Sequence, residues 1–178
     1  MSWLIPPSPA AAMPSRPPVH WQIRPVEAAD GCRLHAVCYP NLPYSTFQTR
    51  FERLAQWQQS GRALYLVVES TPVQADAAPA GDGGDLLAGG LLVTYPRYGE
   101  IAELFVVPMF RRLGIGTAVI WQLMATAVAW ALPAVEIGVT VGNESARRLY
   151  QRLGFVVDRQ IILPGDGQPA LILRRDLE

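Results

Sequence analysis

The stretch VVPMFRRLGIGTAVIWQLM, residues Val106–Met124, decides the fold of this chain. The apolar segment Ile101–Val107 predicts a strand, and Pro108 ends it. After a short loop with two arginines and two glycines, an apolar helix pattern runs from about Thr117 to Leu132. A strand, a glycine loop and a helix N-terminus in this order favour phosphate binding. Glycines let successive N–H groups point one way, and the helix dipole adds partial positive charge.

The loop sequence narrows the choice of phosphate ligand. The dinucleotide pattern G-x-G-x-x-G fails, because Val119 stands at its third glycine. The nucleoside triphosphate loop needs Gly-Lys-Ser/Thr, and the chain contains no lysine. The pattern present is R-x-x-G-x-G preceded by V-x-P, in which Arg111 and Arg112 supply full charge for phosphate oxygens. Taken alone, it also fits a glycine turn before a buried helix.

Length and composition restrict the function classes. The 178 residues suit one domain, and the 15 cationic side chains balance 15 acidic ones, so we expect no nucleic-acid partner. Cys32 and Cys38 lack metal-ligand spacing and a secretory context, which favours free thiols in a reducing cytoplasm and no metal site. No apolar run is long enough to span a membrane, so we expect no membrane partner either.

The N-terminal segment differs from the rest of the chain. Residues 1–18 contain six prolines and no periodic pattern, which predicts a disordered leader. Met13 is an alternative start. The domain is therefore expected to span residues 19–178.

The remaining sequence alternates between strand and helix patterns. The expected strands are Trp21–Pro25, Ala63–Glu69, Leu86–Tyr95, Glu100–Val107, Val135–Val141, Phe155–Leu163 and Pro169–Arg175. The expected helices are Ala28–Val37, a second one capped by Ser45 or Thr46 and ending near Gln59, Thr117–Leu132 and Glu144–Leu153. The pair Gly89-Gly90 suggests a bulge or a close approach, and the last two strands form a closing hairpin.

A second motif, VGNESARRLYQRLGF, occupies residues 141–155. Asn143 is a good helix N-cap, and Glu144 and Arg148 are spaced as an i,i+4 ion pair. One face of the expected helix carries Ala146, Leu149, Tyr150 and Leu153. Taken alone, this face indicates a core tyrosine in an amphipathic helix.

The two motifs together, R-x-x-G-x-G and then N-x-x-A-x-x-L-Y-x-x-L-G-F, resemble the signature of the GNAT superfamily of N-acyltransferases. The resemblance covers about Trp21–Asp176. It implies an α/β (α+β) fold with a mixed, mostly antiparallel sheet of six to seven strands flanked by about four helices. The strands at Glu100–Val107 and Val135–Val141 would lie parallel but splay apart, and acetyl-CoA would enter between them.

The same resemblance implies roles for individual residues. Backbone N–H groups of the glycine loop bind the pyrophosphate of acetyl-CoA, while the pantetheine arm runs beside the strand and Asn143. The cofactor-binding residues so implied are Val106, Val107, Arg111, Arg112, Leu113, Gly114, Ile115, Gly116, Thr117 and Asn143. Tyr150 points at the thioester sulfur. No metal is implied.

The implied chemistry is direct transfer of the acetyl group to a primary amine. An alkyl ammonium has a pKa of about 10.4 and a thiol about 8.5, so the amine must lose a proton and the sulfur gains from receiving one. Tyr150 is the expected proton donor and Glu103 the expected acceptor, with Glu100, Glu136 or water as alternatives. In the branch that acetylates protein N-termini, an acid lies five residues before the motif asparagine. Gly138 stands there in this chain, which weakens that assignment.

The acceptor amine is not identified by the sequence. Tyr44 and Phe47, in the segment between the first two helices, are the expected substrate-binding residues, whereas His20 and His35 are expected to be structural or exposed. The primary hypothesis is a cytoplasmic acetyl-CoA-dependent N-acetyltransferase, monomeric or homodimeric, acting on a small-molecule or peptide amine. The alternative is a non-catalytic acyl-CoA-binding or regulatory module. A longer acyl donor also stays open.

Overall fold

The computed structural model describes residues 19–71, 84–163 and 167–177, so the expected leader lies outside the described residues. These residues form a seven-stranded sheet in the order β1-β2-β3-β4-β5-β7-β6. The strands are β1 Trp21–Pro25, β2 Ala63–Ser70, β3 Leu86–Tyr95, β4 Tyr98–Val106, β5 Ala134–Thr140, β6 Val156–Ile162 and β7 Pro169–Asp176. Neighbours are antiparallel except for β4 and β5, which confirms the expected fold class.

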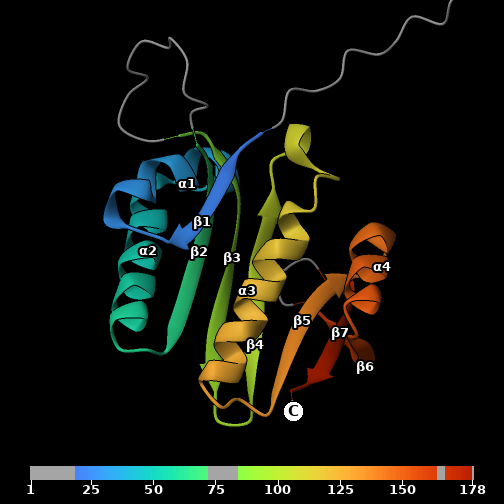
Figure 1. Ribbon diagram of the computed structural model, residues 1–178. Coiled ribbons are helices and arrows are strands. Elements are labelled where there is room, and N and C mark those ends of the chain that lie inside the picture. Colours follow the sequence, from blue (N-terminus) through green and yellow to red (C-terminus); the bar gives the residue numbers. More distant parts are fainter. Residues whose placement is uncertain (1–18, 72–83, 164–166, 178) are drawn as a thin grey trace, which may run out of the picture.

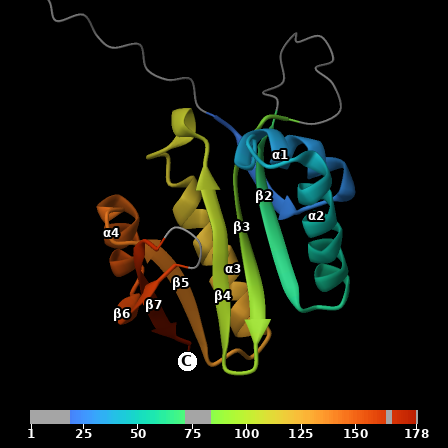
Figure 2. The same ribbon diagram turned by 180° about the vertical axis from the view of Figure 1, so that it is seen from behind.

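Helices cover both faces of this sheet. They are α1 Gly31–Cys38, α2 Tyr44–Gln59, α3 Ile115–Ala129 and α4 Glu144–Arg152, with short 3-10 turns at Ala28–Asp30 and Pro108–Phe110. Figure 1 shows α3 lying across the near face of the strands, and the view from behind in Figure 2 places the strands in front of it. Side chains of α1 and α2 pack into a separate core on the opposite face.

Strand β2 is covered on both faces, which explains its nearly continuous apolar sequence. Leu66 and Val68 join the core under α3, whereas Tyr65 and Val67 join the core under α1 and α2. A strand that is covered on both faces needs apolar side chains at every position. Each fully buried Val or Leu contributes roughly 1.5–3 kcal/mol relative to its exposed state.

Helix α2 begins differently from the sequence-based expectation. The carbonyl of Pro43 accepts hydrogen bonds from the N–H groups of Thr46 and Phe47, at 3.0 and 3.1 Å, so Pro43 is the N-cap. No side chain caps this end, and the prediction of Ser45 or Thr46 as the cap is wrong. The fixed φ of proline, here −54°, sets the helix entry instead.

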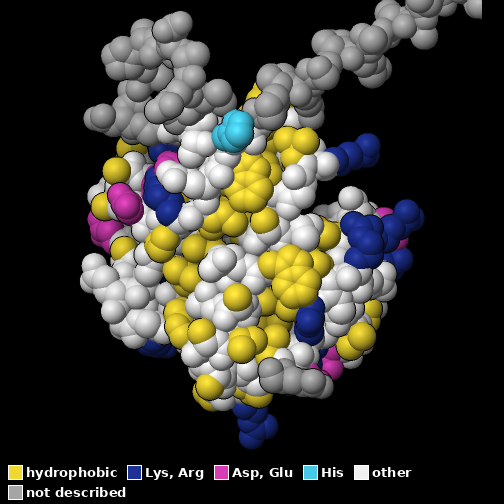
Figure 3. Space-filling view, in the orientation of Figure 1, with side chains coloured by type: hydrophobic (Ala, Val, Ile, Leu, Met, Phe, Trp, Pro, Cys, Tyr) yellow, Lys and Arg dark blue, Asp and Glu magenta, His cyan; other side chains and the backbone are white. Residues whose placement is uncertain are grey.

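Helix α3 is apolar on more than its inner side. Trp121 and Val128 are about half exposed, and Figure 3 shows hydrophobic side chains gathered over this face of the molecule. The Arg175 guanidinium lies 5.3 Å from the centre of the Trp121 ring. This contact partly covers the tryptophan and links α3 to the end of β7.

Strand β4 carries a bulge where it pairs with β3. Leu91 lies opposite Ala102 and Gly89 opposite Phe105, so two residues of β4, Glu103 and Leu104, face one residue of β3. Glu103 has a φ of +52°, a left-handed conformation that is uncommon outside glycine. The irregularity expected at Gly89-Gly90 is therefore confirmed, with the extra residue on β4.

The pairing of β4 with β5 is short. Only Gly99, Glu100 and Ile101 of β4 pair with β5, although β4 continues to Val106. Beyond Ile101 the two strands diverge, as Figure 1 shows, and one edge of β4 is left without a partner strand. The expected splayed pair is confirmed. Strand β7 pairs with β5 and places β6 at the sheet edge, an order that the closing hairpin alone did not specify.

The close packing of Gly89 generates a stability prediction. A Cβ atom there would lie 2.6 Å from Cε1 of Phe105 and 2.9 Å from the Leu66 carbonyl oxygen, so Gly89→Ala should lower the free energy of unfolding by about 1–3 kcal/mol. Urea unfolding measures the change. Gly138→Ala in β5, whose Cβ would meet only Ile172 at 3.6 Å, is the matched control and should not destabilise. Equal unfolding midpoints for the Gly89 variant and the wild type would contradict this packing.

Candidate active site

The glycine loop ends in a helix N-terminus with free backbone donors. Gly114 is the N-cap of α3 and adopts φ +80°, which glycine tolerates without strain. Its carbonyl accepts the first helical hydrogen bond from Ala118 at 3.0 Å. The N–H groups of Ile115, Gly116 and Thr117 precede that bond and have no partner among the described residues. Three orphan donors and the helix dipole together favour an anion at this position.

Space around this loop is open. A Cβ built on Gly114 meets no atom within 4 Å, whereas one on Gly116 would lie 3.2 Å from Cγ2 of Val106. Arg112, with φ +66°, and Arg111 are both exposed. Figure 3 shows a notch at the upper right of the molecule with basic side chains on both of its sides.

The free edge of β4 leads up to this loop. The N–H of Val107 donates to the Leu87 carbonyl of β3 at 2.8 Å, so its donor is used within the sheet. The Val106 carbonyl instead accepts a hydrogen bond from Nε of Arg111 at 3.1 Å. Of the two valines implied to lie beside pantetheine, Val106 is therefore the one that the loop arginine contacts.

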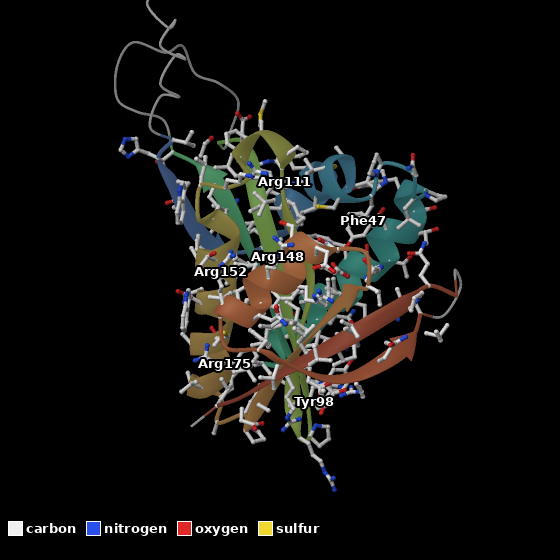
Figure 4. The ribbon with its side chains drawn as sticks, turned by 90° about the vertical axis from the view of Figure 1, so that its right-hand side faces the viewer. Phe47, Tyr98, Arg111, Arg148, Arg152 and Arg175 are labelled. Atoms are coloured by element: carbon white, nitrogen blue, oxygen red, sulfur yellow. The ribbon has the colours of Figure 1, made fainter. Side chains whose placement is uncertain are left out.

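Helix α4 faces the diverging end of β4. The Asn143 side chain accepts a hydrogen bond from the Ala146 N–H at 3.1 Å, which confirms the predicted N-cap. Glu144 pairs with Arg147 at 2.8 Å and not with Arg148, so the predicted i,i+4 pair is wrong. The i,i+3 spacing also brings side chains together on a helix. Arg148 is left exposed and forms no ion pair with a described residue (Figure 4).

Tyr150 lies on the inner face of α4. Its side chain is only 6% exposed, and its ring centre lies 6.2 Å from that of Phe155 in the core under α3. Burial raises the pKa of Tyr150 above its usual value, so the phenol keeps its proton at neutral pH. Its hydroxyl has no hydrogen-bond partner among the described residues. The tyrosine is therefore a core residue and also an available proton donor.

Glu103 is turned toward the opposite face by the bulge. Its carboxylate contacts the Arg50 guanidinium of α2, and its side chain is 12% exposed. The pKa of Tyr39, at the end of α1, is raised first by burial and then by a hydrogen bond to Glu103. Glu103 thus belongs to a polar cluster between β4 and the first two helices.

Glu136 and Glu100, the alternative proton acceptors, lie in different surroundings from Glu103. Glu136 is buried and pairs with Arg159 at 2.7 Å and with Arg174 at 3.3 Å, so it joins β5 to β6 and β7. Glu100 lies beside Tyr95, whose pKa is raised by burial and by this carboxylate. The β3–β4 hairpin, to which both residues belong, turns at the end of β4 opposite the glycine loop (Figure 1). Glu103 is the acid on the diverging half of the strand.

The expected acceptor-binding residues differ in exposure. Tyr44 is 45% exposed, and its hydroxyl lies 3.3 Å from Sγ of Cys32. Phe47 is buried in an aromatic cluster, stacked at 5.6 Å on Phe51, so any effect on an acceptor passes through its neighbours. Nε2 of His35 lies 2.7 Å from the Leu42 carbonyl oxygen, which supports the structural interpretation of that histidine.

The sequence analysis did not identify Arg50. Arg50 lies three residues after Phe47, about one helical turn further along α2. This spacing from an expected substrate-binding residue is the feature of the sequence that could have indicated Arg50. Its guanidinium lies 5.5 Å from the centre of the Tyr39 ring and contacts Glu103. No local pattern reveals a partner that lies 53 positions further along the chain.

Comparison with known proteins identifies the family. A sequence model described as the Acetyltransferase (GNAT) family matches residues 32–155, most of the chain. The protein belongs to this family.

Two relatives match more locally. An uncharacterized N-acetyltransferase of Mycobacterium tuberculosis is 30% identical over 59 residues, 33% of this chain and 38% of that protein. The N-alpha-acetyltransferase 30 of Xenopus laevis is 37% identical over 65 residues, 36% of this chain and 24% of that protein. The chain thus spans well under half the length of each.

Solved structures share the fold over nearly the whole chain. Ard1 from Thermoplasma volcanium superposes with a TM-score of 0.71 at 19% identity, covering 90% of this chain and 99% of that one. The spermidine N-acetyltransferase of Vibrio cholerae, in complex with CoA and spermine, gives 0.68 at 18% identity, covering 88% and 95%. At these identities the likeness establishes the fold.

Gly114 provides a binding test with a matched control. Gly114→Val and Gly61→Val both place a branched side chain at a positive φ, +80° and +70°, with no atom within 4 Å of the new Cβ. Both should lose about 1–2 kcal/mol of stability through backbone strain. Only Gly114→Val should abolish the rise in melting temperature that acetyl-CoA causes, because its side chain occupies the space before the free N–H groups. An unchanged rise in folded Gly114→Val would remove the loop from the binding site.

Proposed function

We propose that this protein is an acetyl-CoA-dependent N-acetyltransferase that transfers the acetyl group directly to a primary amine. The observation that carries the proposal is the open edge of β4 beyond Ile101, which leads to three free N–H groups at the start of α3. Membership of the GNAT family supports it. We propose residues 19–178 as the extent of the acetyltransferase domain.

The residues present fit acetyl-CoA. The free N–H groups of Ile115, Gly116 and Thr117 would receive the pyrophosphate, with Arg111 and Arg112 adding charge. The edge of β4 near Val106 and the start of α4 at Asn143 would flank the pantetheine arm. Acetyl-CoA supplies an activated acyl group as a thioester.

Two proton transfers accompany the exchange of the C–S bond for a C–N bond. The amine must lose a proton, and Glu103 is the proposed acceptor, directly or through water. The leaving sulfur takes a proton from Tyr150, which burial keeps protonated. The donor packs in the core under α3 and α4, while the acceptor faces α1 and α2. The divergence of β4 and β5 opens the sheet between these two faces.

Location and assembly remain predictions. No helix in the described parts of the chain is long and apolar enough to cross a membrane. We propose a cytoplasmic protein that acts as a monomer or a homodimer. A small-molecule or peptide amine is the proposed acceptor.

Tyr150→Phe tests the proton donor. The ring volume is retained and the hydroxyl has no partner among the described residues, so stability should change by less than about 1 kcal/mol. Turnover should fall by roughly 10²–10⁴, as expected for loss of a general acid, while the acetyl-CoA-induced rise in melting temperature stays. CoA release in a panel of amines measures this effect, with Tyr98→Phe at the distant hairpin as control. Wild-type turnover in Tyr150→Phe would exclude the residue from the reaction.

Glu103→Gln tests the proton acceptor. At pH 7 its turnover should drop by roughly 10²–10⁴. Activity should then recover as pH rises toward about 10, because more of the amine is already neutral. Glu100→Gln, on the same strand, is the control and should keep both rate and pH profile. A Glu103→Gln protein with the wild-type profile would assign the proton to water or to another group.

A further inference from the structure

The surroundings of Glu103 form a compact polar cluster between β4, α1 and α2. The carboxylate contacts the Arg50 guanidinium, and Arg50 also lies over the Tyr39 ring. The pKa of Tyr65 is raised by burial first and then by the nearby charge of Glu103. The pKa of the Cys38 thiol is raised to about 12 by burial and by Glu103. At neutral pH both phenols and the thiol are uncharged, so Arg50 and Glu103 are the charged members.

One member of the cluster has an unused hydrogen-bonding group. The Tyr65 hydroxyl is buried, with its residue only 2% exposed, and it has no hydrogen-bond partner among the described residues. A buried hydroxyl without a partner is unfavourable and uncommon, which makes Tyr65 a notable member of the cluster. Among the charged groups, Glu103 has the largest effect on the pKa of Tyr65, which it raises.

The two members of the Arg50–Glu103 ion pair differ in how far their side chains are exposed to solvent. The Arg50 side chain is 46% exposed, whereas that of Glu103 is 12% exposed. Arg50 also lines a surface hollow along the outer side of α2, whose other lining residues are Leu42, Ser45, Thr46, Thr49, Glu52, Arg53 and Gln56. The guanidinium therefore connects solvent and this polar hollow with the carboxylate proposed to accept the amine proton.

Resting on the proposed function, we infer that the acceptor is a primary amine with a carboxylate one or two carbons from its nitrogen, as in a free amino acid. Glu103 would bind the amine and Arg50 the carboxylate. The two protein groups are in contact, so a ligand that meets both must carry its own charges close together. A guanidinium fork matches a carboxylate in two parallel hydrogen bonds.

The charge balance disfavours acceptors without an anion. An amine that approaches Glu103 competes with Arg50 for the same carboxylate. A ligand with its own carboxylate compensates the released guanidinium, whereas a polyamine is repelled by it. A peptide N-terminus has a neutral amide where a free amino acid has its carboxylate. Free amino acids should therefore be preferred over their amides, over peptides and over polyamines.

The test compares acids with matched amides. CoA release is measured with acetyl-CoA and the common free amino acids, their amides, β-alanine, a short peptide and spermidine. For the preferred side chain, the free acid should exceed its amide in kcat/KM by at least about tenfold. The amide keeps the amine and side chain and loses only the negative charge.

Arg50→Gln then assigns the discrimination to one residue. It should lower kcat/KM for the free acid by roughly 10- to 100-fold and leave the amide nearly unchanged. Arg50→Lys should restore part of the preference, because it keeps the charge without the fork. Arg62→Gln is the control and should keep the full preference, because Arg62 also lies over Trp57 of α2 but does not line the hollow.

The outcomes separate this inference from the proposed function. Amides, peptides or spermidine reacting as well as free acids would overturn the inference, and so would equal losses for acid and amide in Arg50→Gln. Acetyl-CoA binding with no turnover of any carboxylated amine would also overturn it, while leaving the acetyl-CoA site intact. Failure of acetyl-CoA to raise the melting temperature would contradict the proposed function itself.

Discussion

Strand β4 has one residue more than β3 between Ala102 and Phe105, and the site is arranged around this irregularity. A bulge bends the strand and changes which face its side chains point to. Here it turns Glu103 toward α1 and α2 while Leu104 and Val106 pack toward α3. The same segment of β4 diverges from β5. One edge of β4 is therefore unpaired there, although β4 lies in the middle of the sheet. Gly89 allows this, because a Cβ atom there would lie 2.6 Å from Cε1 of Phe105 and 2.9 Å from the Leu66 carbonyl oxygen.

The opening in the sheet would also let Tyr150 and Glu103, which lie toward opposite faces, take part in the proposed reaction. Tyr150 belongs to the core on one face, and Glu103 borders the core on the other. A continuous sheet would separate them. Burial is compatible with both proposed roles, since it keeps the phenol protonated and holds the carboxylate against a single arginine. Stability and the proposed chemistry therefore depend on the same packing.

Much of this arrangement could be predicted from local sequence. The glycine loop and the Asn143 cap follow from short motifs whose geometry is set by neighbouring residues, whereas the splayed strands were implied by the resemblance to the GNAT superfamily. The burial of Phe47, the Arg50–Glu103 contact and the insertion of β7 beside β5 depend on residues far apart in the chain. Local patterns contain no information about such partners. Glu144 had two arginines at suitable spacing, and in the structure it pairs with Arg147.

Amide hydrogen exchange tests the central claim most directly, which is that acetyl-CoA binds the free edge of β4 and the start of α3. Exchange is measured residue by residue with and without acetyl-CoA. The N–H groups of Ile115, Gly116 and Thr117 should gain strong protection, because they have no partner among the described residues until phosphate oxygens bind them. The edge strand β6 should exchange as before. Protection elsewhere, with these three amides unchanged, would contradict the account.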